Sequence, residues 1–172
     1  MSQLHPIPVS ELHQNVFTAI GKEWMLITAE TEKDGKATAN TMTASWGGLG
    51  RLWNKDVAFA FIRPQRYTKE FVDNADTFSL CFFGGEKMQE LGYLGTVSGR
   101  DEDKIAKSGL TLTHIDGVPC FEEATTVLLC RKMYVQTLRE DCFTDRAVME
   151  SSYPQRDFHD VYVAEIMKVL VK

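Results

Sequence analysis

Apolar residues lie along the chain in short runs that have the length and composition of β-strands. Residues 24–31 (WMLITAET) and 37–45 are joined at residues 33–36 by an Asp-Gly pair, which is typical of a hairpin turn. Residues 57–62 (VAFAFI) are apolar at every position, as in a central strand buried on both faces. A further strand is predicted over residues 77–83.

The second half of the chain predicts two longer strands, over residues 125–138 and 161–171. Period-2 spacing places one set of residues on one face of the last strand: Val161, Val163, Met167, Val169 and Val171. We expect helices over residues 68–72, 84–94 and 101–107, and an irregular excursion with one helical turn over residues 139–155. About seven strands joined by hairpins, with few helices, predict a mainly β fold, an antiparallel barrel of Greek-key type. No repeat or linker divides the chain, so residues 1–172 are expected to form a single domain.

Composition narrows the classes of partner. The net charge of −5 does not favour nucleic acid, and no apolar run approaches the roughly 20 residues that span a bilayer. The first eight residues lack the features of a signal peptide, so we expect a cytoplasmic protein. The four cysteines are far apart and have no metal-ligand spacing, which predicts reduced structural thiols and no metal site: Cys81, Cys120, Cys130 and Cys142.

The segment 40–48 (NTMTASWGG) leads out of a predicted strand and is rich in hydroxyl groups. Alternation places one set of side chains on one face: Thr41, Thr43 and Ser45. Gly47 and Gly48 allow a ligand or another backbone to approach closely, and Trp46 is suited to line a flat ring. An ordinary solvent-exposed strand face followed by a loop is equally consistent with these residues.

Two further segments are candidates for binding an anion. In residues 63–68 (RPQRYT), Arg63 and Arg66 precede a predicted helix capped by Thr68, and guanidinium groups pair well with phosphate. Residues 98–100 (SGR) form a second, nest-like loop. Solvated arginines beside plainly capped surface helices are the alternative. The sequence contains neither the G-x-S-x-G motif of a hydrolase nor the G-x-G-x-x-G motif of a Rossmann site.

Taken in order, these motifs resemble the flavin reductase-like family, which has an FMN-binding split barrel, and within it the flavoredoxin branch. The resemblance runs from about Trp24 to the end of the chain and includes residues 40–50, 53–55, 63–68, 78–83, 91–93, 95–104, 129–132 and 159–166. Ala164 is a departure, because the family usually has glycine at that position of its terminal G-E-[IV] motif.

The resemblance implies a homodimer of split barrels with FMN near the subunit interface. By position, the ring and ribityl chain of FMN would contact Asn40, Thr43, Ala44 and Ser45, with Trp46 lining the ring. The phosphate and the chain that leads to it would be held by Arg63, Arg66, Tyr67 and Thr68. Ser98, Arg100 and Lys104 would complete the anion end or stabilise its loop.

The implied reaction is hydride transfer from NADH or NADPH to the flavin, followed by electron transfer to an acceptor or a redox partner protein. The cofactor carries this chemistry, so no acid–base dyad is required, and the catalytic residues are not identified by the sequence. His159 is a candidate for positioning the nicotinamide, although a polar residue paired with Asp160 explains it equally well. Three alternatives stay open: a non-enzymatic FMN electron carrier, an oxidoreductase whose organic substrate meets residues 139–155, and a cofactor-free interaction module.

Overall fold

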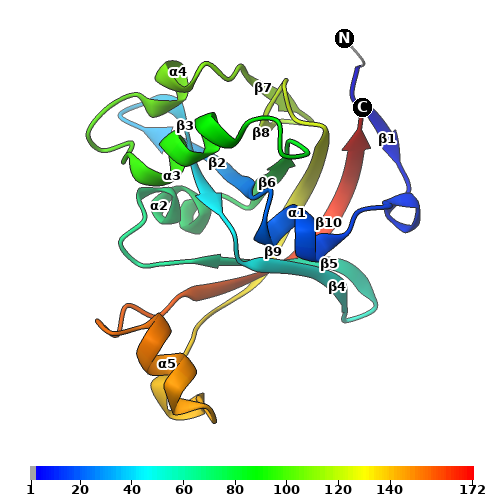
Figure 1. The fold of residues 1–172 in the computed structure, drawn as a ribbon. Helices are drawn as coiled ribbons and strands as arrows, with labels where there is room; N and C mark the ends of the chain where they lie inside the picture. The colour runs from blue at the N-terminus through cyan, green and yellow to red at the C-terminus, as the bar shows by residue number, and fades with distance from the viewer. Residues whose placement is uncertain (1–2) are drawn as a thin grey trace.

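An antiparallel sheet dominates the computed structural model, which describes residues 3–172 (Figure 1). Its strand order is β3-β2-β6-β9-β10-β5-β4, and β1 pairs with β10. These strands are β1 (His5–Ile7), β2 (Met25–Lys33), β3 (Lys36–Ala44), β4 (Gly47–Leu52), β5 (Lys55–Ile62), β6 (Thr77–Phe82), β9 (Thr126–Thr137) and β10 (Asp160–Val171). A separate hairpin is formed by β7 (Leu112–Ile115) and β8 (Val118–Phe121). The mainly β, antiparallel fold predicted from the sequence is confirmed.

Short helices cover the sheet or project from it. They are η1 (Val9–Glu11), α1 (Val16–Gly21), α2 (Tyr67–Asn74), α3 (Met88–Thr96), α4 (Lys104–Ser108), η2 (Glu140–Cys142) and α5 (Arg146–Ser152). Helix α2 packs against β2 and β3, while α3 packs against β3 and α4. Residues 139–157, which we call the arm, carry η2 and α5 and project from the sheet between β9 and β10 (Figure 1). None of the helices within residues 3–172 is long and apolar enough to cross a membrane.

Two apolar clusters form the core, one on each side of the sheet. The first includes Ile27, Phe71 and Tyr162, which join β2, α2 and β10. The second includes Phe83 and Phe121, which cluster with apolar residues of α3 and of the β7–β8 hairpin. Where β2, β6 and β9 are covered on both faces, over residues 25–27, 80–82 and 127–130, successive residues are apolar rather than alternating.

The structure corrects several element predictions. Residues 47–52 form β4 instead of a loop, so β5 lies second from the edge of the sheet and is not central. Thr68 does not cap α2, because the helix begins one residue earlier and Arg66 is its N-cap. Helix α3 begins at Met88, and the arm contains two helices rather than one turn. Met167 is 45% exposed, since a register shift interrupts the predicted alternation in β10.

The two adjacent glycines of β4 differ in the space around them. A Cβ on Gly47 would lie 2.9 Å from Met25 Cε and 2.9 Å from the carbonyl oxygen of Phe59. A Cβ on Gly48 would make an ordinary contact of 3.7 Å with the Phe59 ring. Gly47 therefore allows β4 to cross closely over the end of β2.

We predict that Gly47→Ala lowers the free energy of unfolding by about 1–3 kcal/mol, because the backbone oxygen of Phe59 cannot move away from the added methyl group. Gly48→Ala is the matched control and should cost less than about 1 kcal/mol. Urea unfolding of the two variants measures the difference. Equal midpoints would contradict the close approach of β4 to β2 and β5.

Candidate functional site

Two adjacent cavities lie where β3 and β5 end and β10 begins. The strand-end cavity, of about 210 Å³, is lined by Met42, Thr43, Ala44, Ser45, Trp46, Phe61, Arg63, Arg66 and His159. The cationic cavity, of about 290 Å³, is lined by Met42, Arg63, Gln65, Arg66, Tyr67, Thr68, Thr96, Val97, Ser98 and Lys104. The two cavities share three of these residues, Met42, Arg63 and Arg66, and therefore lie end to end.

Aromatic rings form one wall of the strand-end cavity. The ring centroid of His159 lies 5.0 Å from that of Trp46 and 6.4 Å from that of Phe61. His159 is buried, and its Nδ1 shares a hydrogen bond of 2.7 Å with the hydroxyl of Tyr153. Burial, together with the positive charge of Arg63, lowers the pKa of His159 to about 4. His159 is therefore a neutral imidazole at physiological pH.

The cationic cavity holds two positive charges that face backbone carbonyl groups. Arg66 Nη1 donates to Gly95 O at 2.7 Å, and Lys104 Nζ donates to Leu94 O at 2.9 Å and to Val97 O at 3.0 Å. Within residues 3–172 neither side chain forms an ion pair with a carboxylate.

The pKa values of both groups are lowered, because each is partly buried and lies near another positive charge. Burial, with the nearby charge of Arg66, lowers the pKa of Lys104 to about 8. Burial and the charge of Arg63 likewise lower the pKa of Arg66. An anion bound between the two side chains would relieve this unfavourable electrostatic environment, and the hydroxyls of Thr68 and Ser98 on the cavity wall are further donors.

Arg63 has a different environment, because the arm neutralises it. Its guanidinium group pairs with Asp157, donates to Ser152 O at 2.9 Å and lies over the ring of Tyr153. Hydrogen bonds from Gln65 and Arg63 hold the pKa of Asp157 below its usual value. Arg63 thus anchors the arm beside the site, and its charge is largely compensated.

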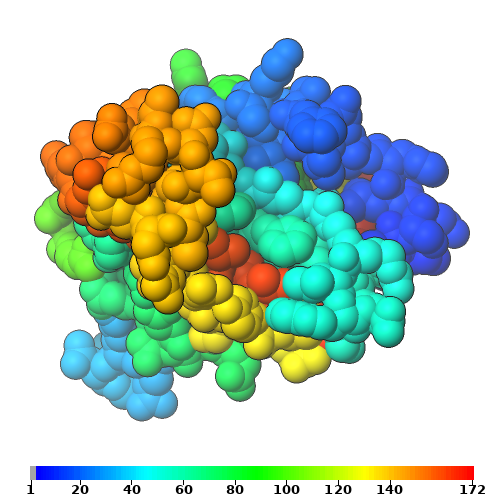
Figure 2. Space-filling model, turned by 90° about the horizontal axis from the view of Figure 1, so that it is seen from below, coloured from blue at the N-terminus to red at the C-terminus, as the bar shows by residue number. Residues whose placement is uncertain are grey.

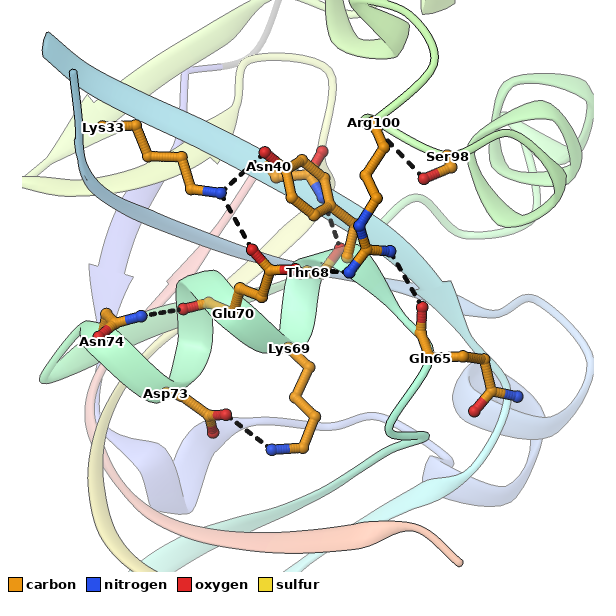
Figure 3. Close-up of polar contacts among 11 residues, drawn as sticks. Lys33, Asn40, Gln65, Thr68, Lys69, Glu70, Asp73, Asn74, Ser98 and Arg100 are labelled. Carbon is orange, nitrogen blue, oxygen red and sulfur yellow. Dashed lines mark hydrogen bonds and ion pairs between the residues drawn. The ribbon is translucent and has the colours of Figure 1, made fainter. Parts of the chain in front are cut away.

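A second polar cluster lies on the outer side of α2 (Figure 3). Glu70 accepts from Arg100 Nη2 at 2.5 Å and from Lys33 Nζ at 3.1 Å, and both cations also lie over the ring of Tyr67. Arg100 further donates to Gln65 O at 3.2 Å. These contacts fasten the loop of residues 97–103 to the start of α2.

Gly99 of this loop packs closely against Asn40 of β3. Asn40 Nδ2 donates to Thr68 Oγ1 at 2.9 Å, and both side chains are buried. A Cβ on Gly99 would lie only 2.4 Å from Asn40 Oδ1, so glycine is needed for the loop to close against β3. Asn40 supports the wall of the cationic cavity from behind.

Comparison with known proteins identifies the fold family. Residues 17–172 match the model of the flavin reductase like domain. The chain belongs to the flavin reductase-like family. No curated protein matches the chain. The resemblance that the ordered motifs indicated is thereby confirmed.

Solved structures share this fold at low sequence identity. Flavoredoxin from Methanosarcina acetivorans is 24% identical with a TM-score of 0.63, covering 87% of this chain and 68% of that protein. The FMN-binding domain of a flavin reductases-like enzyme from Shewanella baltica is 13% identical with a TM-score of 0.67, covering 99% and 79%. Flavoredoxin of Desulfovibrio vulgaris is 18% identical with a TM-score of 0.65, covering 100% and 73%. The protein therefore has the split-barrel fold of this family.

The structure brings most of the predicted site residues together around the two cavities: Thr43, Ala44, Ser45, Trp46, Arg63, Arg66, Tyr67, Thr68, Ser98, Lys104 and His159. Asn40 and Arg100 line neither cavity. Thr43 lines the strand-end cavity while its hydroxyl donates to Leu91 O at 2.5 Å. Phe61, which lies in a uniformly apolar run, and Met42, which lies in β3, also line the strand-end cavity, and no sequence signal distinguishes them from core residues.

We predict that the imidazole of His159 stays neutral down to about pH 4, because burial and the charge of Arg63 oppose its protonation. An unfolded chain binds this proton near pH 6.5, so the free energy of unfolding falls as the pH is lowered from 6.5 toward 4. Ring-nitrogen shifts in NMR spectra measure the titration, and His159→Gln assigns the signal. A midpoint near 6.5 would mean that the ring is solvated and free of these neighbours.

Proposed function

We propose that the protein binds FMN along the two adjacent cavities and acts as an NAD(P)H-dependent flavin oxidoreductase. One observation carries this proposal: an aromatic-walled cavity continues into a cavity that has two cations without carboxylate partners. FMN has the same asymmetry, with a flat uncharged ring at one end and a phosphate at the other. Family membership supports the assignment.

The chain's own residues suggest how such a ligand would lie. Arg66 and Lys104, with the hydroxyls of Thr68 and Ser98, would hold the phosphate. The end of β3 offers small side chains and backbone groups to the ring, and Trp46 would cover it from the rim. The flavin supplies the capacity to accept a hydride and pass on its electrons, while the protein orients and shields it.

NADH or NADPH is the proposed electron donor, and His159 is the candidate for positioning the nicotinamide. Its ring stands at the wall of the strand-end cavity, neutral and oriented by the hydroxyl of Tyr153. With Nδ1 bonded to the Tyr153 hydroxyl, Nε2 is left to form one hydrogen bond with a carboxamide, and the neutral ring adds no charge beside the flavin. The reduced flavin would then serve an acceptor or a redox partner protein.

The second candidate is an electron carrier without a productive NAD(P)H site. Arg63, the cation that lies next to His159, is compensated by Asp157. With Arg66 engaged by the FMN phosphate, none of the residues lining the strand-end cavity would offer a further unpaired cation to a nucleotide's phosphates. Two proteins with the same fold are flavoredoxins. This candidate shares the FMN site and differs only in the route of electron entry.

We also propose a homodimer in the cytoplasm. In Figure 2, β10 is visible between the arm and the β4–β5 hairpin, so this face of the sheet is not covered by other parts of the chain. Trp53 in the β4–β5 turn and Tyr134 in β9 are 55% and 44% exposed, with ring centroids 6.0 Å apart. Exposed aromatic pairs of this kind are typical of subunit interfaces.

The visible spectrum of the FMN-loaded protein, recorded anaerobically with NADH and then NADPH, tests the proposed activity. We expect the flavin absorbance to bleach at a catalytic rate with one of the two nucleotides. Bleaching with dithionite alone would favour the electron carrier. Failure of FMN to bind would overturn both candidates, and light scattering of the same sample reports whether one or two chains are present.

We further predict that FMN affinity falls above about pH 8, where Lys104 loses its proton in the free protein and must regain it to pair with phosphate. The decrease approaches tenfold per pH unit. Lys104→Met should remove this dependence and weaken binding at pH 7 by about tenfold to a hundredfold. Riboflavin, which lacks the phosphate, is the matched control ligand, and fluorescence titration measures both. Equal pH profiles for FMN and riboflavin would place the phosphate elsewhere.

A further inference from the structure

A third cavity, which we call the apolar cavity, adjoins the strand-end cavity on the side of α1. Its volume is about 540 Å³, and its walls are Val16, Phe17, Ile20, Gly21, Ser45, Trp46, Gly47, Gly48, Leu49, Phe61, Leu138 and Tyr153. Ser45, Trp46 and Phe61 line both cavities, so a molecule in the apolar cavity would lie beside one in the strand-end cavity. The volume is in the range of small-molecule sites.

The side chains that line the apolar cavity indicate which class of ligand it can bind. None of the residues that line the apolar cavity carries a charge, which makes it a poor site for the phosphates of a nucleotide. Ser45 is exposed, and its hydroxyl has no hydrogen-bond partner within residues 3–172, so it is free to donate. A flat, uncharged molecule with a carbonyl oxygen matches this combination.

Phe17 is a wall residue that contributes little to the core: it is 85% exposed, whereas Ala19 and Ile20 of the same helix are buried. The fold gains almost nothing from a side chain so exposed, so its aromatic surface is available to a ligand. Gly21, at the end of the helix, leaves the cavity open: a Cβ there would meet no atom within 4 Å.

We propose that the apolar cavity binds a small, uncharged aromatic carbonyl compound of the quinone class as the electron acceptor. The proposed binding of the quinone is inferred from the cavity alone, whereas its role as electron acceptor rests on the proposed flavin function. A quinone would take one hydride from the reduced flavin and one proton from water, leaving as the hydroquinone while the flavin returns to its oxidised form. Trp46 and Phe61 form the boundary across which the two molecules meet.

Isothermal titration calorimetry of the full chain with duroquinone, with and without FMN, tests the binding. Duroquinone has no ring hydrogen at which the exposed Cys142 thiol could add. Gly21→Leu fills the cavity and should weaken binding at least about tenfold. Gly92→Leu is the matched control, a helical glycine with equally open surroundings outside the cavity, and should bind as the parent does. Anthraquinone-2-sulfonate should bind more weakly than uncharged anthraquinone, because no cation lines the cavity.

Phe17→Ala separates a ligand role from a structural one. It should weaken duroquinone binding severalfold and leave the melting temperature unchanged, since the side chain is 85% exposed. Equal affinity in the parent and Gly21→Leu, or no binding to the parent, would overturn the proposal. If these variants instead dissociate a dimer, a second copy of the chain covers the cavity and the proposal is equally wrong. Loss of FMN binding with duroquinone binding intact would refute only the flavin function.

Discussion

Burial of two cations without a carboxylate partner is the constraint around which the site is built. Arg66 and Lys104 lie close enough for the charge of one to lower the pKa of the other, and both are partly withdrawn from water. The end of α3 compensates for this by turning the carbonyl groups of residues 94, 95 and 97 toward them, where the helix dipole favours positive charge. The end of α3 and the side chains of Arg66 and Lys104 thus hold the following loop in a conformation in which an anion could bind between the two cations.

The loop after α3 depends on contacts from three other parts of the chain. Gly99 closes against Asn40 of β3, Arg100 is tied to Glu70 of α2, and Lys33 at the end of β2 joins the same carboxylate. The exposed ion pairs contribute little individually, on the order of 0–1 kcal/mol each. Their importance is geometric, because together they fix the wall of the cationic cavity without placing a carboxylate in it. The acidic group that balances Arg100 lies on the outer side of α2 (Figure 3).

The strands were predictable where apolar runs were bounded by strong turn signals, as at the hairpin of residues 33–36. The strand β4 was not predictable, because Gly47 and Gly48 are typical of loops. The close approach of β4 to β2 explains why glycine occupies position 47 of this strand. Site residues within one segment, such as Ser45 and Trp46, could be recognised from local chemistry. The neutralisation of the Arg63 charge could not be predicted, because its partner Asp157 is 94 positions away in the sequence.

Charge varies along the three cavities in one direction, and this orders the proposed ligands. The cationic cavity is lined by the unpaired Arg66 and Lys104, and the strand-end cavity shares only Arg66 of these two. Its other wall groups include the neutral His159 and the compensated Arg63, and the apolar cavity has no charged wall residue. An amphiphilic ligand with one phosphate therefore has a single favourable orientation, phosphate toward Lys104 and ring toward Trp46. Reversing it would move the phosphate away from Lys104 and toward aromatic rings, where its desolvation is less well compensated. The same gradient excludes a charged acceptor from the far end, so the electrostatics that orient the flavin would also select its reaction partner.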